Sequence, residues 1–245
     1  MKSCRGFTLV ELAMVLFVVS LLLGGLLVPL ATQIEARQRS DAEAQLEKIR
    51  EALIGFAIIN GRLPCHTTEP NPASASYGEE NLPCNTLTTD GILPWKTLGL
   101  NSGYDPWGVP RNLATDPWTG FWRYRIDNNF YTTFSLNTTT TSFLSVRELD
   151  TANSTPGSPV FNEVISTSER PIAIFYSTGA NQLADGENSS FESAPTSAAP
   201  AYYERGDVNN LDRDGDGNED EFDDITIWLT RPLLFNRMVS AGVLP

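Results

Sequence analysis

The residues best suited to chemistry lie in an acidic stretch near the C-terminal end of the chain, between residues 204 and 224. Carboxylates alternate there with other residues, and Gly217 follows where a loop wrapped round an ion needs a tight turn. Calcium takes roughly six to eight oxygen ligands, which such a loop supplies from alternate positions. The spacing matches a calcium-loop signature as far as Gly217. The ligands predicted for calcium are Asp212, Asp214, Asp216, the carbonyl oxygen of Asn218, Asp220 and Asp223.

The stretch departs from the signature at its last position, where Asp223 stands in place of glutamate and offers a shorter side chain. No helix signals flank the loop, so an EF-hand domain is not inferred. The alternative is a solvated acidic loop that binds no ion. The whole chain is acidic, with 17 Lys and Arg against 30 Asp and Glu and a formal net charge of -13. This balance fits calcium or a basic partner and argues against contact with nucleic acid phosphates.

Residues for enzyme chemistry are scarce. The one histidine, His66, directly follows Cys65, and adjacent residues in a loop seldom face each other as a nucleophile and its base must. His66 is therefore expected at the surface. The chain contains no Gly-x-Ser-x-Gly sequence, no Walker-type phosphate loop and no zinc-ligand spacing. The sequence therefore predicts a protein that is not an enzyme.

The N-terminal stretch combines a basic head, Lys2 and Arg5, with an apolar run that reaches Ala31. The run is about long enough to cross a bilayer as a helix, which needs ~20 residues. Glu11 lies just inside its start, and an acid at the edge of a lipid-embedded helix is a functional hypothesis by default. Such a carboxylate is tolerable only when a cationic partner lies at the same depth.

The sequence GFTLVE, from Gly6 to Glu11, resembles the processing site of class III signal peptides, which occur in type IV pilins and in the pseudopilins of type II secretion. The resemblance implies that a prepilin peptidase cuts between Gly6 and Phe7 and methylates the new amino terminus. It also implies that Glu11 pairs with the amine of a neighbouring subunit and so sets the axial step of a filament. A Sec signal peptide fits less well, because it needs a shorter apolar core and a small-x-small cleavage site. A plain membrane anchor is the other alternative.

The leader implied by this resemblance, residues 1–6, contains Cys4, so the processed chain keeps only Cys65 and Cys84. A cysteine pair on the far side of a membrane indicates a disulfide. The bond would close a loop of roughly 20 residues and stabilise the fold by ~3 kcal/mol. Two buried, unpaired thiols are the alternative.

A second resemblance supports the metal prediction. Residues 175–181, then Asp185, then residues 223–228 are similar to the calcium-bearing β-loop of major pseudopilins, in which two such segments surround one calcium. The insert between them, residues 186–222, is much longer here, so the ligand set stays open and two sites are allowed. Asp-Pro-Trp occurs in two turns, Asp105–Gly108 and Asp116–Gly120, and the second leads into the strand-like Phe121–Arg125. This resembles the Asp-Pro-Trp-Gly turn before the first strands of the major pseudopilin, and the turn residues are expected to be structural.

One long helix is predicted over residues 7–60, with residues 7–31 as its transmembrane and assembly part. Asn60-Gly61 ends it, and Pro64 follows closely. Its second half shows apolar residues at spacings of three and four, which predicts one face packed on a globular domain. The residues of this face are Leu46, Ile49, Leu53 and Phe56.

Residues 61–245 are predicted to form a single globular domain with long loops, because proline, glycine, serine and threonine recur along them. The fold class is α+β: a pilin-like fold in which the long helix packs on a small antiparallel sheet. A short helix is expected within residues 232–241. Strands are predicted at Phe121–Arg125, Phe130–Ser135, Ser142–Val146, Ile172–Ser177 and Ile225–Trp228.

The sequence therefore predicts a structural subunit, a pseudopilin or minor pilin, that polymerises through its N-terminal helix into a type II secretion pseudopilus or a type IV pilus. It would cross the inner membrane once and hold its C-terminal domain in the periplasm. The expected partners are other pilin or pseudopilin subunits, prepilin peptidase and the inner-membrane assembly platform. The alternative is a tip-located adhesin or DNA-uptake minor pilin. Glu11 argues against it, because tip subunits often lack that acid.

Overall fold

The computed structural model divides the chain into two compact units, Met1–Ser40 and Asp41–Pro245. Helix α1, Leu9–Asn60, belongs to the first unit at its start and to the second at its end. The residues described are 8–84, 90–108, 118–141, 144–166, 169–183, 185–188, 201–206, 212–213, 215–217 and 222–243.

Helix α1 ends where the sequence predicts. Gly61 adopts a left-handed conformation, with φ of 68°, and its N–H donates to the carbonyl oxygen of Ala57 at 2.8 Å. A residue without Cβ is favoured at this position because L side chains crowd the backbone there. The helix is continuous from Leu9 to Asn60, including the backbone at Pro29, a residue type that usually weakens or kinks a helix.

The face of α1 in the second unit packs on the main hydrophobic core, as its spacing predicts. Leu46 and Leu53 are fully buried. Phe56 is half-buried, and the Arg62 guanidinium lies 5.3 Å from the centre of its ring. The buried residues of this face are Ala42, Leu46, Ile49, Leu53, Ile54 and Ala57.

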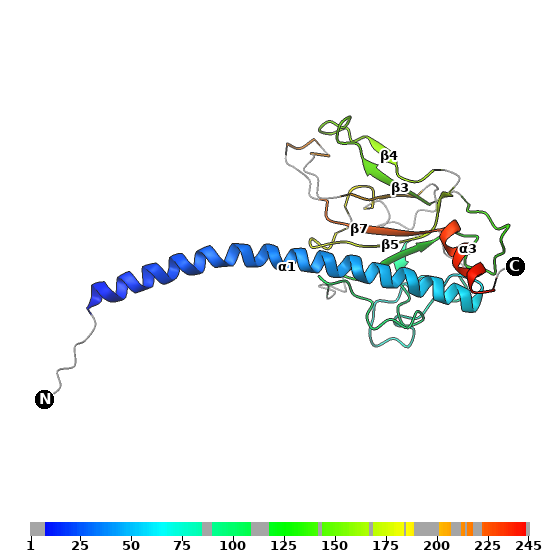
Figure 1. The fold of residues 1–245 in the computed structure, drawn as a ribbon, viewed down its shortest axis with the longest axis horizontal. Helices are drawn as coiled ribbons and strands as arrows, with labels where there is room; N and C mark the ends of the chain where they lie inside the picture. The colour runs from blue at the N-terminus through cyan, green and yellow to red at the C-terminus, as the bar shows by residue number, and fades with distance from the viewer. Residues whose placement is uncertain are drawn as a thin grey trace. The chain divides into compact units, whose positions relative to one another are not determined.

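The first sheet has four strands in the order β1-β2-β5-β7, and all of its pairs are antiparallel. The strands are β1 Gly91–Ile92, β2 Arg123–Ile126, β5 Pro171–Ser177 and β7 Ile225–Thr230. In Figure 1, β5 and β7 run side by side although they are far apart in the chain. Register across the sheet places Tyr124 opposite Phe175, and Phe175 opposite Ile227.

Strand β5 is buried along its whole length because both faces of the sheet are covered. Ala173 and Phe175 pack in the core that contains α1. Ile174 and Tyr176, which point to the other face, pack with Leu144 of a second sheet. The alternation follows from the two-residue period of a strand.

The second sheet has three strands in the order β4-β3-β6. They are β3 Leu144–Leu149, β4 Phe161–Glu163 and β6 Ala201–Glu204. β4 pairs with β3 antiparallel, whereas β6 pairs with β3 in parallel. The α+β class is confirmed, but the antiparallel sheet of the sequence prediction has a second sheet beside it that contains a parallel pair. The second sheet covers the face of β5 that points away from α1, where Ile174 and Tyr176 pack with Leu144 and Val146.

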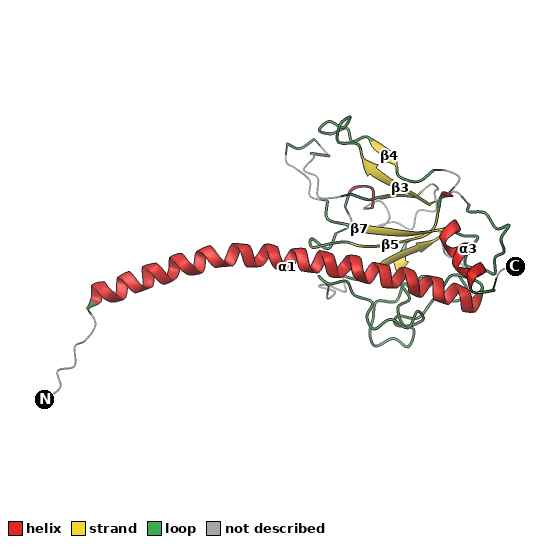
Figure 2. Ribbon diagram, viewed as in Figure 1, coloured by secondary structure: helices red, strands yellow, loops and turns green. Residues whose placement is uncertain are grey.

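The strand predicted at Phe130–Ser135 is wrong. Asp127 accepts the N–H of Asn129 through Oδ1 at 2.9 Å and starts a turn instead. The apolar residues there are core residues of a loop: the rings of Phe130 and Phe134 lie 5.1 Å apart, and Phe134 stacks on Phe235 of the last helix at 5.8 Å. The short C-terminal helix is confirmed as α3, Arg231–Ser240, and a short helical turn, η2, spans Gly186–Asn188. Figure 2 shows how much of the second unit consists of loops.

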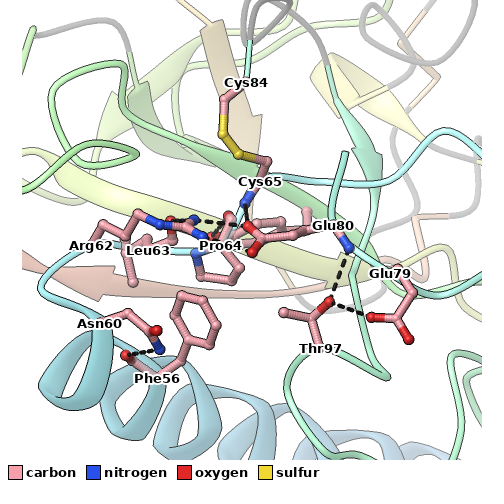
Figure 3. Close-up of polar contacts among 11 residues, drawn as sticks. Phe56, Asn60, Arg62, Leu63, Pro64, Cys65, Glu79, Glu80, Cys84 and Thr97 are labelled. Carbon is pink, nitrogen blue, oxygen red and sulfur yellow. Dashed lines mark hydrogen bonds and ion pairs between the residues drawn. A yellow bond between two sulfur atoms is a disulfide. The ribbon is translucent and has the colours of Figure 1, made fainter. Parts of the chain in front are cut away.

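The predicted disulfide between Cys65 and Cys84 is present, with Cα atoms 5.7 Å apart (Figure 3). An ion pair lies beside it: Arg62 donates to both oxygens of Glu80, at 2.8 and 2.7 Å. Glu80 also accepts the N–H of Cys65 at 3.1 Å, and its own N–H donates to Thr97 at 2.9 Å. Bidentate arginine–carboxylate pairs are strong and directional, so this pair holds the disulfide loop to the end of α1.

The expectation that His66 lies at the surface is wrong. Its side chain is 4% exposed, and its ring packs against Gly91 so closely that a Cβ there would lie 2.8 Å from the Cβ of His66. Burial lowers the pKa of His66 to about 4; Asp90 opposes this, and Arg125 and Arg123 add to it. The bridge between Thr67 and β1 carries the histidine into the fold.

Burial of His66 is expected to contribute a loss of stability to the domain in mild acid. Between pH 6.5, the ordinary pKa, and about 4, the folded value, the unfolded chain binds a proton that the folded chain refuses. The full difference amounts to about 3 kcal/mol. We expect a His66→Gln variant to show a smaller loss of melting temperature between pH 7 and pH 4.5 than the original chain. Equal losses in the two proteins would contradict this assignment.

Candidate functional site

Three carboxylates converge in the second unit, at the end of the first sheet. Asp185, Asp223 and Asp224 each offer one oxygen, and these oxygens all lie within 4.8 Å of one another. Asp223 and Asp224 are 7% and 1% exposed, and Asp185 is half-buried. We call these three residues the acidic cluster.

Pairing of β5 with β7 brings the acidic cluster together. Ser177, the last residue of β5, lies opposite Ile225, the first residue of β7. The turn that follows β5 therefore lies beside the two aspartates that precede β7. Gly179 in this turn has φ of 60°, and a Cβ there would come within 2.6 Å of the carbonyl oxygen and Oδ1 of Asp223. Only glycine accommodates this approach.

Each aspartate of the cluster accepts hydrogen bonds through Oδ2. Asp223 accepts the N–H of Asn181 at 2.9 Å. Asp224 accepts the N–H of Asp185 at 3.1 Å and the side-chain amide of Asn188 at 2.7 Å. Asp185 accepts the side-chain amide of Asn181 at 2.9 Å. Backbone N–H groups and the side-chain amides of Asn181 and Asn188 thus fix the orientation of the three carboxylates.

Two oxygens of the cluster remain buried without a hydrogen-bond partner in the described structure, Oδ1 of Asp223 and Oδ1 of Asp224. Buried polar atoms are nearly always satisfied in folded proteins, and an unsatisfied charged atom is costly. A hard cation satisfies carboxylate oxygens of this kind. The donor set therefore fits calcium, which the sequence predicts for this region.

Electrostatics in the cluster favour the uptake of positive charge. Burial raises the pKa of Asp223 to about 6, and its contact with Asp185 adds to the rise. Burial also raises the pKa of Asp224 well above its usual range, helped by the charges of Asp185 and Asp223. Three like charges that are shielded from water repel one another, so the cluster can gain stability from a proton or from a metal ion.

The residues of the calcium-loop signature are only partly brought into this cluster. Asp223 belongs to it. Among the residues that the structure describes, Asp212 and Asp216 do not join it. Asp214, Asn218 and Asp220 lie outside the described residues.

Asp212 instead closes a loop of its own. It accepts the N–H groups of Gly215 at 2.6 Å, Asp216 at 3.1 Å and Gly217 at 3.0 Å. Gly217, with φ of 91°, makes the tight turn that the signature requires. The described part of this loop therefore folds back on the carboxylate of Asp212.

Part of the acidic stretch is neutralised from within the chain. Nη1 of Arg213 lies 2.6 Å from Oε2 of Glu204, whose side chain is fully buried. The same guanidinium lies 5.1 Å from the centre of the Phe222 ring. Repulsion in this stretch is therefore smaller than its sequence suggests.

Asp185 and Asp224 were not among the ligands predicted from the loop spacing. The resemblance to the β-loop of major pseudopilins included both residues, which flank the long insert. The resemblance could therefore have identified Asp185 and Asp224. The pairing of β5 with β7, which makes them neighbours, could not be predicted across the long insert.

The N-terminal residues of the first unit form a second candidate site. Oε2 of Glu11 accepts the N–H of Thr8 at 2.8 Å and its hydroxyl at 2.9 Å, and the N–H of Glu11 donates to that hydroxyl at 3.3 Å. This reciprocal arrangement is a capping box, and it explains why α1 begins at Leu9. Gly6 and Phe7 lie outside the described residues.

The large apolar side chains between Leu9 and Leu21 are exposed. Leu9 is 85% exposed and Phe17 is 68% exposed. Exposed apolar surface of this extent marks contact with lipid or with another protein. None of the helices in the described part of the chain has both the length and the apolarity needed to cross a membrane.

Residues 1–27 match the prokaryotic N-terminal methylation motif. The chain carries the class III signal peptide of type IV pilins and pseudopilins. The resemblance of residues 6–11 to a class III signal peptide is thereby confirmed. No curated protein and no solved structure matches the chain.

The motif suggests processing by prepilin peptidase and assembly with other pilin subunits. It is also consistent with membrane anchoring. The match ends at residue 27, before the second unit begins. The motif therefore gives no evidence about the acidic cluster, and a role for the cluster has to be inferred from its geometry.

Proposed function

We propose that this chain is a structural subunit, a pseudopilin or minor pilin, that enters a type II secretion pseudopilus or a type IV pilus. Residues 7–31 would anchor it in the inner membrane with one pass, and residues 61–245 would lie in the periplasm. The observation that carries this proposal is the methylation motif at residues 1–27, continuous with a helix whose apolar side chains are exposed. Lipid before assembly, and neighbouring subunits afterwards, would cover that surface.

We also propose that the second unit binds calcium at Asp185, Asp223 and Asp224. The ion would supply positive charge between the turn after β5 and the start of β7. Two buried oxygens without hydrogen-bond partners, on Asp223 and Asp224, support this assignment. The sequence prediction of a calcium loop with ligands from Asp212 to Asp223 allows one or two sites, and a second ion would bind in the part of that loop that precedes Asp223. A bound calcium ion would fix the conformation of the turn after β5. A rigid surface suits a filament subunit outside the cytoplasm, because each copy must form the same contacts with its neighbours.

Removal of the leader tests the proposed function most directly. In cells with an active prepilin peptidase, we expect mass spectrometry of the membrane-extracted chain to show a terminus at Phe7 that carries one methyl group. Gly6→Ala is expected to slow this removal, because the peptidase needs a residue of little bulk beside the bond. Ser3→Ala, in the same leader but away from the bond, serves as the control. An intact Met1 in the unmodified chain would refute the proposal.

A further inference from the structure

We propose that Asp105 supplies negative charge to the acidic cluster without binding the ion itself, and thereby sets the affinity of the cluster for a divalent cation. The inference rests on the calcium site proposed above. It assigns a function to the Asp-Pro-Trp-Gly turn, which the sequence identified only as structural.

Asp105 is a buried carboxylate, 5% exposed, whose two oxygens are both engaged. Oδ1 accepts the N–H of Trp107 at 3.1 Å. Oδ2 accepts the hydroxyl of Ser177, the last residue of β5, at 2.6 Å. A carboxylate held by two donors of its own chain is oriented by them and keeps its charge in place.

The contacts of Ser177 lead from Asp105 to the cluster. The hydroxyl oxygen of Ser177 accepts the N–H of Gly179 at 3.2 Å. Gly179 in turn packs so closely on Asp223 that an added Cβ would lie 2.6 Å from its Oδ1. One short turn thus separates Asp105 from Asp223. Burial raises the pKa of Asp105 to about 6, and the charge of Asp223 adds to the rise, which agrees with this proximity.

A second connection keeps Asp105 at its present position. Gln182, in the same turn as Gly179, is 2% exposed and has a left-handed backbone, with φ of 63°. Its side-chain amide donates to the carbonyl oxygen of Trp107 at 2.7 Å. The preceding residue, Asn181, donates its N–H to Asp223. The turn therefore contacts the 105–108 segment on one side and the cluster on the other.

This arrangement gives the charge of Asp105 opposite effects in the free and the loaded protein. Without an ion, a fourth buried carboxylate adds to the repulsion among Asp185, Asp223 and Asp224 and lowers stability. With a divalent cation present, the same charge attracts the ion through the weakly screening interior. A residue with a purely structural role would not change these two quantities in opposite directions.

Asp105→Asn removes the charge and keeps the shape. The amide oxygen can still accept the N–H of Trp107, and the amide N–H₂ can donate to the hydroxyl of Ser177. For the full-length chain in detergent, we expect calcium titration calorimetry to show affinity about tenfold weaker than in the original chain. In chelator, the melting temperature of the variant should be higher.

Asp127→Asn is the matched control. Asp127 is also a buried aspartate, 1% exposed, but its N–H donates to Ile172 at the opposite end of β5. Its neutralisation should leave calcium affinity unchanged. Asp105→Ser has a hydroxyl that can also accept the N–H of Trp107. It should show the same weaker calcium affinity and higher melting temperature in chelator as Asp105→Asn, and it replaces Asp105→Asn if the asparagine variant does not fold.

The outcomes separate this inference from the function on which it rests. An original chain that binds no calcium refutes the calcium site. Calcium affinity of Asp105→Asn equal to that of the original chain, or a lower melting temperature in chelator, refutes the role of Asp105 alone. Complete loss of binding, equal to that of Asp223→Asn, would show that Asp105 is a ligand and would also overturn the proposal.

Discussion

Glu11→Ala is expected to leave the chain in the membrane and to remove it from the filament. The substitution takes a charge out of the apolar helix, which favours insertion. If Glu11 pairs with the methylated amine of a neighbouring subunit, the substitution also leaves that amine without a partner, and an unpaired buried charge costs about 3–5 kcal/mol. The fraction of the variant in sheared filaments, relative to the membrane fraction, should fall at least about tenfold.

The capping box supplies matched controls for this experiment. Glu11→Gln can still accept the hydrogen bonds of Thr8 but has no charge, so it should fail to assemble like the alanine variant. Thr8→Ala removes the hydroxyl of the capping box and keeps the charge, so it should assemble. Normal incorporation of Glu11→Ala beside unmodified subunits would show that no amine–carboxylate pair operates in this protein.

Calcium is expected to produce the largest change in the stability of the second unit. At a calcium concentration a hundredfold above the dissociation constant, binding adds ~2.7 kcal/mol to the free energy of unfolding. For a domain of this size, that corresponds to a rise in melting temperature of about 5–10 °C. Magnesium should give a smaller rise, because an irregular cage of carboxylates suits the larger ion. Melting of the full-length chain in detergent, with calcium and with chelator, measures both.

Two double variants identify where the ion binds. Asp223→Asn with Asp224→Asn should abolish the calcium-dependent rise and should raise the melting temperature in chelator, because buried like charges are removed. Asp214→Ala with Asp216→Ala tests the loop signature and should abolish the rise only if that loop holds the ion responsible. Identical melting curves of the original chain with calcium and with chelator would leave both stretches as acidic surface without an ion.

Features that depend on neighbouring residues could be predicted from the sequence. The methylation motif is a contiguous pattern, so the class III signal peptide could be recognised without a fold. The end of α1 at Gly61 and the helix α3 follow from local backbone preferences and apolar spacing. The strand predicted at Ile172–Ser177 is confirmed as β5, because branched and aromatic residues favour a strand along this segment.

Features that depend on long-range pairing were decided only by the tertiary structure. The aromatic residues and threonines of Phe130–Ser135 favoured a strand, but this segment is a loop of the core that follows the turn at Asp127 and stacks on Phe235. His66 is buried because the bridge from Thr67 to β1 places it against Gly91. The acidic cluster exists because the register of β5 and β7 places Ser177 opposite Ile225, which brings Asp185 to Asp223 and Asp224 across a long insert. Spacing along the chain encodes local geometry, whereas contacts between strands depend on which apolar faces must be covered.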